Sequence, residues 1–184
     1  MLALFLALFL SGLIALSSLA FIIFAIDAVV WKHNNLTSSH QAINEIVKIV
    51  KEFKPGAKTF YDLGCSRGRL AISLKCQLPK LQVFAIDKNL VRICFAKARA
   101  FFWRQKINFR LADIFEIDLS QADIVYIYLW PDIFPALEEK LSRELKPNSL
   151  VIVNTEKLPS WQPVKTRVVH PKAPNFEKLS AYRR

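Results

Sequence analysis

The chain has 184 residues and a formal net charge of +11 at pH 7. About thirty residues at the N-terminus are almost entirely apolar, which leaves roughly 150 for a soluble part: one domain with a real core, and too few for two. The positive charge indicates an acidic partner and carries no information about the fold. The three cysteines lack a C-x-x-C spacing and the three histidines are scattered, which argues against a metal site and favours reduced thiols.

Residues 1–31 are predicted to form a transmembrane anchor. No charged side chain occurs from Met1 to Ile26, and this run exceeds the ~20 residues that cross a hydrocarbon core. Trp31 and Lys32 follow where an interfacial aromatic and a flanking basic residue are typical. A cleaved signal peptide is the alternative, but it requires basic residues before a shorter apolar run. Because every Lys and Arg lies C-terminal to the segment, we expect a single-pass protein of the cell membrane with a cytoplasmic catalytic domain.

Residues 32–54 are predicted to form a linker followed by an amphipathic helix. The polar stretch from Asn34 to Ser39 is typical of a connection, and Ser39 is suited to cap the next helix. Between Gln41 and Phe53 apolar residues recur at helical spacing, with charged residues on the opposite face. Proline and glycine at positions 55 and 56 end this helix.

In residues 55–184 short apolar runs alternate with helical patterns. Strands are expected at 59–63, 81–86, 107–111, 124–129 and 150–153, with helices at 68–78, 90–103 and 132–145. Apolar strands that alternate with helices indicate a parallel sheet covered on both faces. Runs at 164–169 and 176–182, separated by a proline-rich turn, predict an antiparallel pair at the sheet edge. The expected class is α/β: a mostly parallel, Rossmann-like sheet with an antiparallel C-terminal edge, preceded by one transmembrane helix.

The turn after the first strand is the strongest candidate for a ligand site. Two of the chain's four glycines, Gly64 and Gly68, lie in it, and glycine permits positive φ and close approach of a ligand. Ser66 and Arg69 exclude the dinucleotide fingerprint, which needs glycine at 64, 66 and 69. The spacing instead fits Asp-x-Gly-x-Gly-x-Gly, a nucleoside-binding loop that begins at Asp62, with serine replacing the middle glycine. An ordinary strand-to-helix turn is the alternative.

Two further carboxylates follow strands two and three. Asp87 closes the second strand, where a carboxylate can accept both hydroxyls of a ribose. Asp113 follows the third strand and can accept the amino group of an adenine. Either residue can instead be a strand-end or helix-capping aspartate.

The run from Lys54 to Lys165 resembles the class I S-adenosylmethionine-dependent methyltransferases. Within them it is most similar to the small membrane-anchored group that contains the mitochondrial lysine methyltransferases of the adenine nucleotide translocase and of the ATP synthase c subunit, with bacterial relatives. Five segments carry the resemblance: Lys54-Pro55-Gly56; Tyr61-Asp62-Leu63-Gly64 with Gly68-Arg69; Ala112-Asp113-Ile114-Phe115; Tyr128-Leu129-Trp130-Pro131; and Glu144-Leu145-Lys146-Pro147 with Pro159-Ser160-Trp161-Gln162-Pro163.

The resemblance implies a class I methyltransferase fold over residues 55–184, with S-adenosyl-L-methionine as cofactor and a protein lysine as methyl acceptor. The residues implied to bind the cofactor are Asp62, Gly64, Cys65, Gly68, Asp87, Lys88, Asp113 and Ile114. An apolar mouth would keep the acceptor amine neutral. Residues that would line this mouth are Tyr126, Tyr128, Trp130 and Pro131, and the implied catalytic residues are Tyr128, Pro131 and Glu156. Glu156 would orient the amine or receive its proton.

One departure from the family pattern and the net charge keep other functions open. Ser66-Arg67 stands where the family usually has Gly-Asp, so a catalytically degenerate interaction module is one alternative; Arg67 could also pair with the methionine carboxylate of the cofactor. The charge motivates a second alternative, a nucleic-acid methyltransferase, but no Asn/Asp-Pro-Pro-Tyr follows the fourth strand. The sequence leaves the oligomeric state open.

The helix expected at 90–103 is rich in basic and aromatic residues. We expect its basic side chains to form a solvated face that can also rest on anionic lipid. The aromatic run Phe101-Phe102-Trp103 can suit nucleic acid, but its position on a helix favours core packing.

Overall fold

The computed structural model describes residues 1–30, 36–174 and 176–184, without the side chains of residues 3, 23, 24 and 26–30. The predicted interfacial Trp31 and Lys32, and the linker up to Asn35, lie outside the described residues. The chain divides into two compact units, Met1–Asn35 and Leu36–Arg184.

The first unit contains helix α1 (Leu2–Val30). Its segment Leu4–Ile22 is long and apolar enough to cross a membrane, with a mean hydropathy of 2.4 over 19 residues. The hydroxyls of Ser11 and Ser17 donate to the carbonyls of Leu8 and Ile14, each at 2.9 Å. These polar groups are therefore satisfied within the helix, as a hydrocarbon environment requires.

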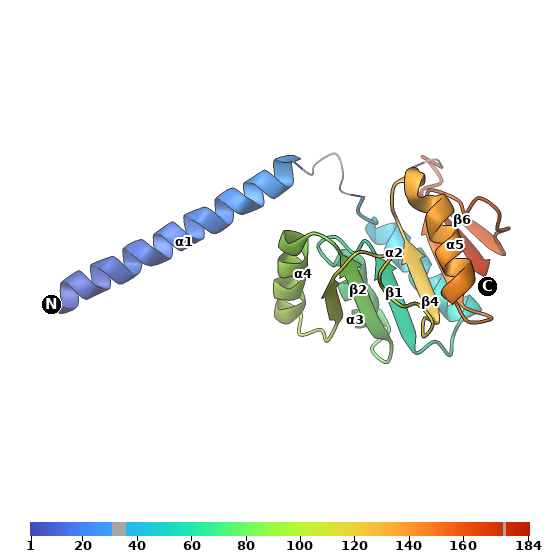
Figure 1. The fold of residues 1–184 in the computed structure, drawn as a ribbon, viewed down its shortest axis with the longest axis horizontal. Helices are drawn as coiled ribbons and strands as arrows, with labels where there is room; N and C mark the ends of the chain where they lie inside the picture. Colours follow the sequence, from blue (N-terminus) through green and yellow to red (C-terminus); the bar gives the residue numbers. More distant parts are fainter. Residues whose placement is uncertain (31–35, 175) are drawn as a thin grey trace. The chain divides into compact units, whose positions relative to one another are not determined.

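The second unit is built on one seven-stranded sheet with the order β3-β2-β1-β4-β5-β7-β6 (Figure 1). Its strands are β1 (Thr59–Leu63), β2 (Gln82–Asp87), β3 (Asn108–Leu111), β4 (Ile124–Ile127), β5 (Leu150–Asn154), β6 (Lys165–Val168) and β7 (Lys178–Arg183). The first five pair in parallel, whereas β7 runs antiparallel to both β5 and β6. The predicted parallel sheet and its antiparallel C-terminal edge are confirmed.

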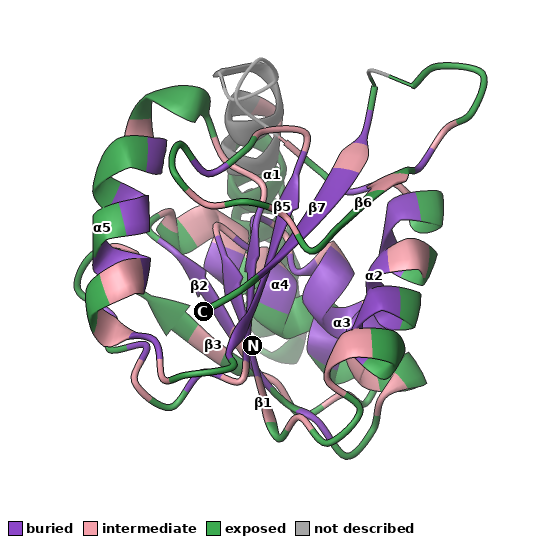
Figure 2. Ribbon diagram, turned by 90° about the vertical axis from the view of Figure 1, so that its right-hand side faces the viewer, coloured by how far each residue is buried: buried purple, intermediate pink, exposed green. Residues whose placement is uncertain are grey.

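Helices cover both faces of this sheet, and each face has its own core (Figure 2). The helices are α2 (His40–Phe53), α3 (Arg69–Gln77), α4 (Leu90–Phe102), the short 3-10 helix η2 (Pro131–Ile133) and α5 (Phe134–Glu144). Buried residues of α2, α3 and α4 form one core with Phe60 and Ile124 of the sheet. Residues of α5, together with Leu63 and Val125, form the other. Burial of apolar area in these layers is the main stabilising term.

The helix ends follow local chemistry. The Ser39 side chain accepts the N–H of Ala42 and caps α2, as predicted. Helix α3 begins after Gly68, whose φ of 69° lies in the left-handed region. The helix predicted from Asp132 starts instead as η2 and continues as α5, with Pro135 in its first turn, where a missing N–H costs nothing.

The prediction that Phe101, Phe102 and Trp103 pack in the core is wrong. These side chains are 80%, 83% and 60% exposed. The buried face of α4 consists instead of Ile93, Ala96 and Ala100, and the two alanines let the helix approach the strands closely.

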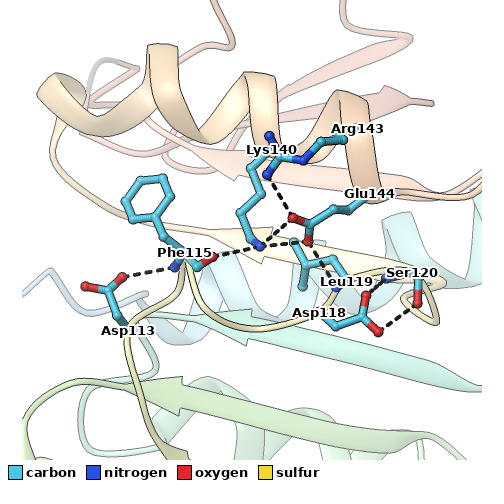
Figure 3. Close-up of polar contacts among 8 residues, drawn as sticks. All are labelled: Asp113, Phe115, Asp118, Leu119, Ser120, Lys140, Arg143 and Glu144. Carbon is cyan, nitrogen blue, oxygen red and sulfur yellow. Dashed lines mark hydrogen bonds and ion pairs between the residues drawn. The ribbon is translucent and has the colours of Figure 1, made fainter.

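The connection between β3 and β4, residues 112–123, is tied to α5 by a buried lysine (Figure 3). Lys140 is 3% exposed; its Nζ donates to the carbonyl of Phe115 at 3.0 Å and to both carboxylate oxygens of Glu144 at 2.7 and 2.8 Å. Glu144 also accepts the N–H of Leu119 at 3.3 Å. One ion pair thus holds the segment that carries Asp113 at two points, Phe115 and Leu119.

Replacing Lys140 by methionine should lower the free energy of unfolding by about 2 kcal/mol, because it removes the buried cation that pairs with Glu144 and the side-chain donor to the carbonyl of Phe115. Arg143→Met is the matched control. Arg143 bonds the same carboxylate, but its side chain is 63% exposed, so its loss should cost less than about 0.5 kcal/mol. Urea unfolding in detergent measures both, and equal losses would contradict the buried role of Lys140.

Candidate functional site

The carboxyl ends of the four central strands meet at one edge of the sheet. Leu63 of β1 lies opposite Ile86 of β2 and Ile127 of β4, and Ile127 lies opposite Val153 of β5. Residues that follow these strand ends therefore converge between β1 and β4, where the strand order reverses. Open α/β sheets bind their ligands at such a reversal point.

The turn after β1 has three left-handed residues. The angle φ is 82° at Gly64, 49° at Ser66 and 69° at Gly68. The N–H groups of Gly64 and Cys65 both donate to the carbonyl of Ile86 at 2.9 Å, which folds the turn over the end of β2. Ser66 thus adopts the backbone that glycine has in the motif, at a cost of about 1–2 kcal/mol.

The carboxylate of Asp87, at the end of β2, fixes this turn. Its Oδ2 accepts the N–H of Ser66 and its Oδ1 accepts the N–H of Asn89, both at 2.9 Å. Asn89 in turn caps α4 by accepting the N–H of Arg92 at 3.0 Å. A carboxylate has about four acceptor positions, so capacity remains on Asp87 for the ribose hydroxyls predicted from the sequence.

Asp62 is a buried carboxyl beside this turn. It is 2% exposed, and its Oδ2 has no hydrogen-bond partner among the described residues. Burial, and then the negative charge of Asp87, raise the pKa of Asp62 to about 7. A buried acceptor without a donor costs about 1–3 kcal/mol, so the site fits a ligand that brings a donor, above all a cationic one.

The two glycines leave no room for a side chain. A Cβ on Gly64 would lie 2.5 Å from Cδ2 of Leu129. A Cβ on Gly68 would lie 3.0 Å from Cβ of Ala96 and 3.1 Å from Cε1 of Phe109. The turn is therefore packed between the end of β4 on one side and α4 with β3 on the other.

The other residues predicted to bind a cofactor differ in exposure. Cys65 is buried, and burial, followed by the charges of Asp62 and Asp87, raises the pKa of its thiol. Lys88 is exposed and Ile114 is half-buried. Asp113 accepts the N–H of Phe115 at 2.9 Å, a local turn that leaves acceptor capacity. Their roles toward a cofactor stay predictions.

The guanidinium of Arg67 lies over a neighbouring ring of α4. Its Cζ is 5.9 Å from the ring centroid of Phe95, a cation–π distance. The residue that reverses the usual charge of the turn therefore contacts the helix that follows β2.

Tyr126 was predicted to line an acceptor mouth, but the structure places it in the core. Tyr126 is 2% exposed, and its hydroxyl bonds Ser38 at 2.6 Å and Asn154 at 3.1 Å. It belongs to a buried polar network in which Asn154 also bonds Glu177. Its ring lies in the core that α2, α3 and α4 form with the sheet, because alternate residues of a strand point to opposite faces.

Tyr128, Trp130 and Pro131 lie beyond the end of β4. Tyr128 is half-buried; burial raises the pKa of its phenol although the hydroxyl bonds the Thr155 side chain. Trp130 is 47% exposed, and Pro131 opens η2. Glu156 follows β5 and is partly exposed.

Thr155 has a left-handed backbone conformation that no glycine or other feature of the sequence predicts. Its φ is 69°, which is rare for a β-branched residue. The N–H of Glu156 donates to the carbonyl of Asn154 at 2.9 Å, so Thr155 forms the centre of a γ-turn, a strained conformation. Such strain is typical of functional segments, and here it sets the direction of both Thr155 and Glu156.

The model of one protein family, the ANTKMT methyltransferase domain, matches residues 62–165, more than half of the chain. The chain belongs to this family. The match begins at Asp62 and so includes the nucleoside loop and the ends of all four central strands. Membership makes the chain a class I S-adenosylmethionine-dependent methyltransferase by family, as the resemblance implied.

Some curated relatives are named for lysine methylation of proteins, and others are named carboxy-S-adenosyl-L-methionine synthases. The chain is 29% identical over 107 residues to a protein-lysine N-methyltransferase of Saccharolobus islandicus, covering 56% of the chain and 65% of the relative. It is 26% identical over 132 residues to the adenine nucleotide translocase lysine N-methyltransferase of Mus musculus, covering 69% and 55%. The Homo sapiens lysine N-methyltransferase of the ATP synthase c subunit is 26% identical over 123 residues, covering 65% and 51%. The chain thus spans about half to two thirds of the length of these relatives.

Solved structures share the fold. An RNA methyltransferase from Salinibacter ruber, in complex with S-adenosyl-L-homocysteine, superposes with a TM-score of 0.72 at 20% identity, over 80% of this chain and 93% of that one. A 1,6-didemethyltoxoflavin-N1-methyltransferase from Burkholderia thailandensis, with bound S-adenosylhomocysteine, gives 0.65 at 14% identity, over 91% and 88%.

Binding of S-adenosylmethionine should depend on pH through Asp62. The raised pKa means that the ligand-free protein gains stability from a protonated Asp62 at low pH and loses it as the pH rises through about 7. A cationic ammonium near Asp62 favours the carboxylate, so binding should release a proton and be several-fold tighter at pH 8 than at pH 6.

Asp62→Asn should abolish this pH dependence. It should also raise the melting temperature of the ligand-free protein at pH 8, by about 2–4 °C for each kcal/mol. Asp118→Asn, which alters an exposed carboxyl, is the control. Calorimetric titration at both pH values measures the effect; unchanged affinity in the wild-type protein would exclude a titrating Asp62.

Proposed function

We propose that this protein is a membrane-anchored S-adenosylmethionine-dependent methyltransferase that transfers a methyl group to a lysine of a protein. The observation that carries the proposal is the match of the family model from Asp62 to Lys165. The lysine acceptor is supported by those curated relatives that are named for lysine methylation of proteins.

The residues of the turn after β1 would hold the cofactor, which supplies an electrophilic methyl group on a positively charged sulfur. Asp62 has a buried carboxylate oxygen without a partner among the described residues, suited to an ammonium. Asp87 would take the ribose hydroxyls while it keeps the turn in place. Gly64 and Gly68 provide the positive φ that brings the backbone close to the ligand. Asp113 and Ile114 would contact the adenine.

The acceptor side would have to keep a lysine amine neutral, because only the unprotonated nitrogen is a nucleophile. An amine loses its proton more readily where it is poorly hydrated. The ring of Tyr128 and the exposed ring of Trp130, with Pro131, are the apolar groups beyond β4. Glu156, directed by the γ-turn at Thr155, would orient the amine or receive its proton.

The proposed anchor is α1. Its apolar segment of 19 residues and its internally bonded serines support a membrane span. All Lys and Arg lie C-terminal to α1, which supports a cytoplasmic catalytic domain of a cell-membrane protein.

A catalytically degenerate interaction module is the second candidate, because Ser66 is strained where the family has glycine. Titration of S-adenosylmethionine into the full chain in detergent distinguishes the two. We expect micromolar binding that is lost in Asp87→Ala. Ser66→Gly should tighten binding several-fold, because it removes the strain at φ 49°. No binding by wild-type protein, with binding restored in Ser66→Gly, would identify a degenerate site.

Replacing Glu156 by glutamine should lower methyl transfer to membrane proteins by about 10²-fold, in the range of a lost general base, without changing the affinity for the cofactor. Glu139→Gln, which alters an exposed carboxylate of α5, should leave transfer unchanged. Incorporation of labelled methyl groups measures both, and full turnover by the Glu156 variant would remove this residue from the proposed mechanism.

A further inference from the structure

Helix α4 carries its larger apolar side chains on the solvent side. The residues that it buries are Ile93, Ala96 and Ala100. Along the opposite side runs an exposed set at helical spacing, which we call the outer stripe: Leu90, Cys94, Ala98, Phe101 and Phe102. Leu90 is 58% exposed, and the two phenylalanines are 80% and 83% exposed. A surface helix normally presents charge at such positions.

The C-terminal end of the stripe is held in one conformation. The N–H of Arg104 donates to the carbonyl of Phe101 at 3.0 Å, and the N–H of Gln105 to that of Ala100 at 2.9 Å. These two bonds form a Schellman motif, with Arg104 at φ 50° where glycine is usual. The rings of Phe101 and Phe102 pack edge to face, with centroids 6.2 Å apart. Trp103, 60% exposed, follows them.

The charged residues in the stretch of sequence that contains the outer stripe are all basic. From Lys88 to Ala112 there are seven basic residues and no Asp or Glu. Lys97, Arg99, Arg104 and Lys106 are exposed. Beside Phe101 lies a groove of about 500 Å³, whose lining includes Lys97, Lys106 and Asn108. The surface is therefore apolar at its centre and cationic at its rim.

We propose that the outer stripe, with Trp103, is a membrane-contact surface that inserts shallowly into an anionic bilayer. A helix in the plane of the interface places its apolar face at the boundary between headgroups and acyl chains and its basic residues among anionic headgroups. Phenylalanine and tryptophan suit that depth. This contact goes beyond the proposed methyl transfer and does not depend on it.

The composition of the stripe favours lipid over nucleic acid. Single-stranded nucleic acid is bound by successive rings that stack on bases along a positive groove. The rings of the stripe lie at its C-terminal end alone, whereas Leu90, Cys94 and Ala98 extend an apolar surface along the rest of the helix. The stripe reaches from the end of α4 next to Asp87 to the opposite end, so docking through it would lay the helix along the bilayer and leave the carboxyl edge of the sheet at its side.

The native Cys94 allows the stripe to be probed without altering it. The full chain with Cys76→Ser carries a nitroxide label on Cys94; the buried thiol of Cys65, whose pKa is raised by burial, does not react. The protein is reconstituted into vesicles of phosphatidylcholine, alone or mixed equally with phosphatidylglycerol. Collision rates with dissolved oxygen and with a water-soluble nickel chelate then report the depth of the label.

We expect the Cys94 label to collide several-fold less with nickel than a label at Glu139→Cys on α5, with Cys76 and Cys94 replaced by serine, and we expect phosphatidylglycerol to enlarge the difference. Phe101→Ser with Phe102→Ser, both exposed positions, should return the Cys94 label to water. A label at Ser11→Cys reports insertion of α1 separately, so that failure of the anchor is distinguished from failure of the stripe.

Two results would overturn the proposal. One is equal access of nickel to labels at 94 and 139 while the Ser11 label is within the bilayer. The other is spin–spin broadening at Cys94 that disappears on dilution with unlabelled protein, which would mean that the stripe pairs two copies of the chain.

Discussion

The carboxylate of Asp87 receives two backbone N–H groups, from Ser66 of the turn after β1 and from Asn89 at the start of α4. Through the first bond it holds the turn in its left-handed conformation, and through the second it sets where α4 begins. The neighbouring strands already fix Asp87 laterally, since Ile86 pairs with Leu63. The turn and the helix therefore cannot shift independently of each other.

The same constraint explains the state of Asp62. Two carboxyl groups lie near each other at the end of neighbouring strands, and Asp87 receives the N–H groups of the turn and the helix. Asp62 has no donor for its Oδ2 in the described part of the chain, and burial with the charge of Asp87 raises its pKa. A like charge and desolvation act in the same direction here, and both favour the protonated carboxyl of Asp62 as long as no cation lies beside it.

Hydrophobic periodicity and turn chemistry were sufficient to predict the sheet, its parallel core and its antiparallel edge. The bounds of β1 are those predicted, because Thr59 to Leu63 lie between a proline–glycine stop and the glycine turn. The scarce glycines likewise located the turn, since Gly64 and Gly68 take positive φ. These features depend on residues that are near one another in the sequence.

Features that depend on distant partners could not be predicted in this way. Helix α4 has apolar residues all around, so periodicity alone does not tell which side packs, and close approach to the sheet selected Ile93, Ala96 and Ala100. The depth of Tyr126 depends on Ser38, 88 residues earlier in the chain. The γ-turn at Thr155 has no marker residue, because its geometry is imposed by the pairing of β5 and β7, with the N–H of Thr155 bonded to Lys178.

Left-handed backbone at non-glycine residues occurs at Ser66, Arg104, Asn148 and Thr155 in the described chain. Asparagine tolerates this region, whereas the other three residues are strained by about 1–2 kcal/mol each. These three lie in the candidate cofactor turn, at the end of the outer stripe and beside Glu156. Substitutions that relieve this strain would therefore change the surfaces proposed to bind the cofactor, the bilayer and the acceptor, so a more thermostable form would have to be selected for stability and for function together.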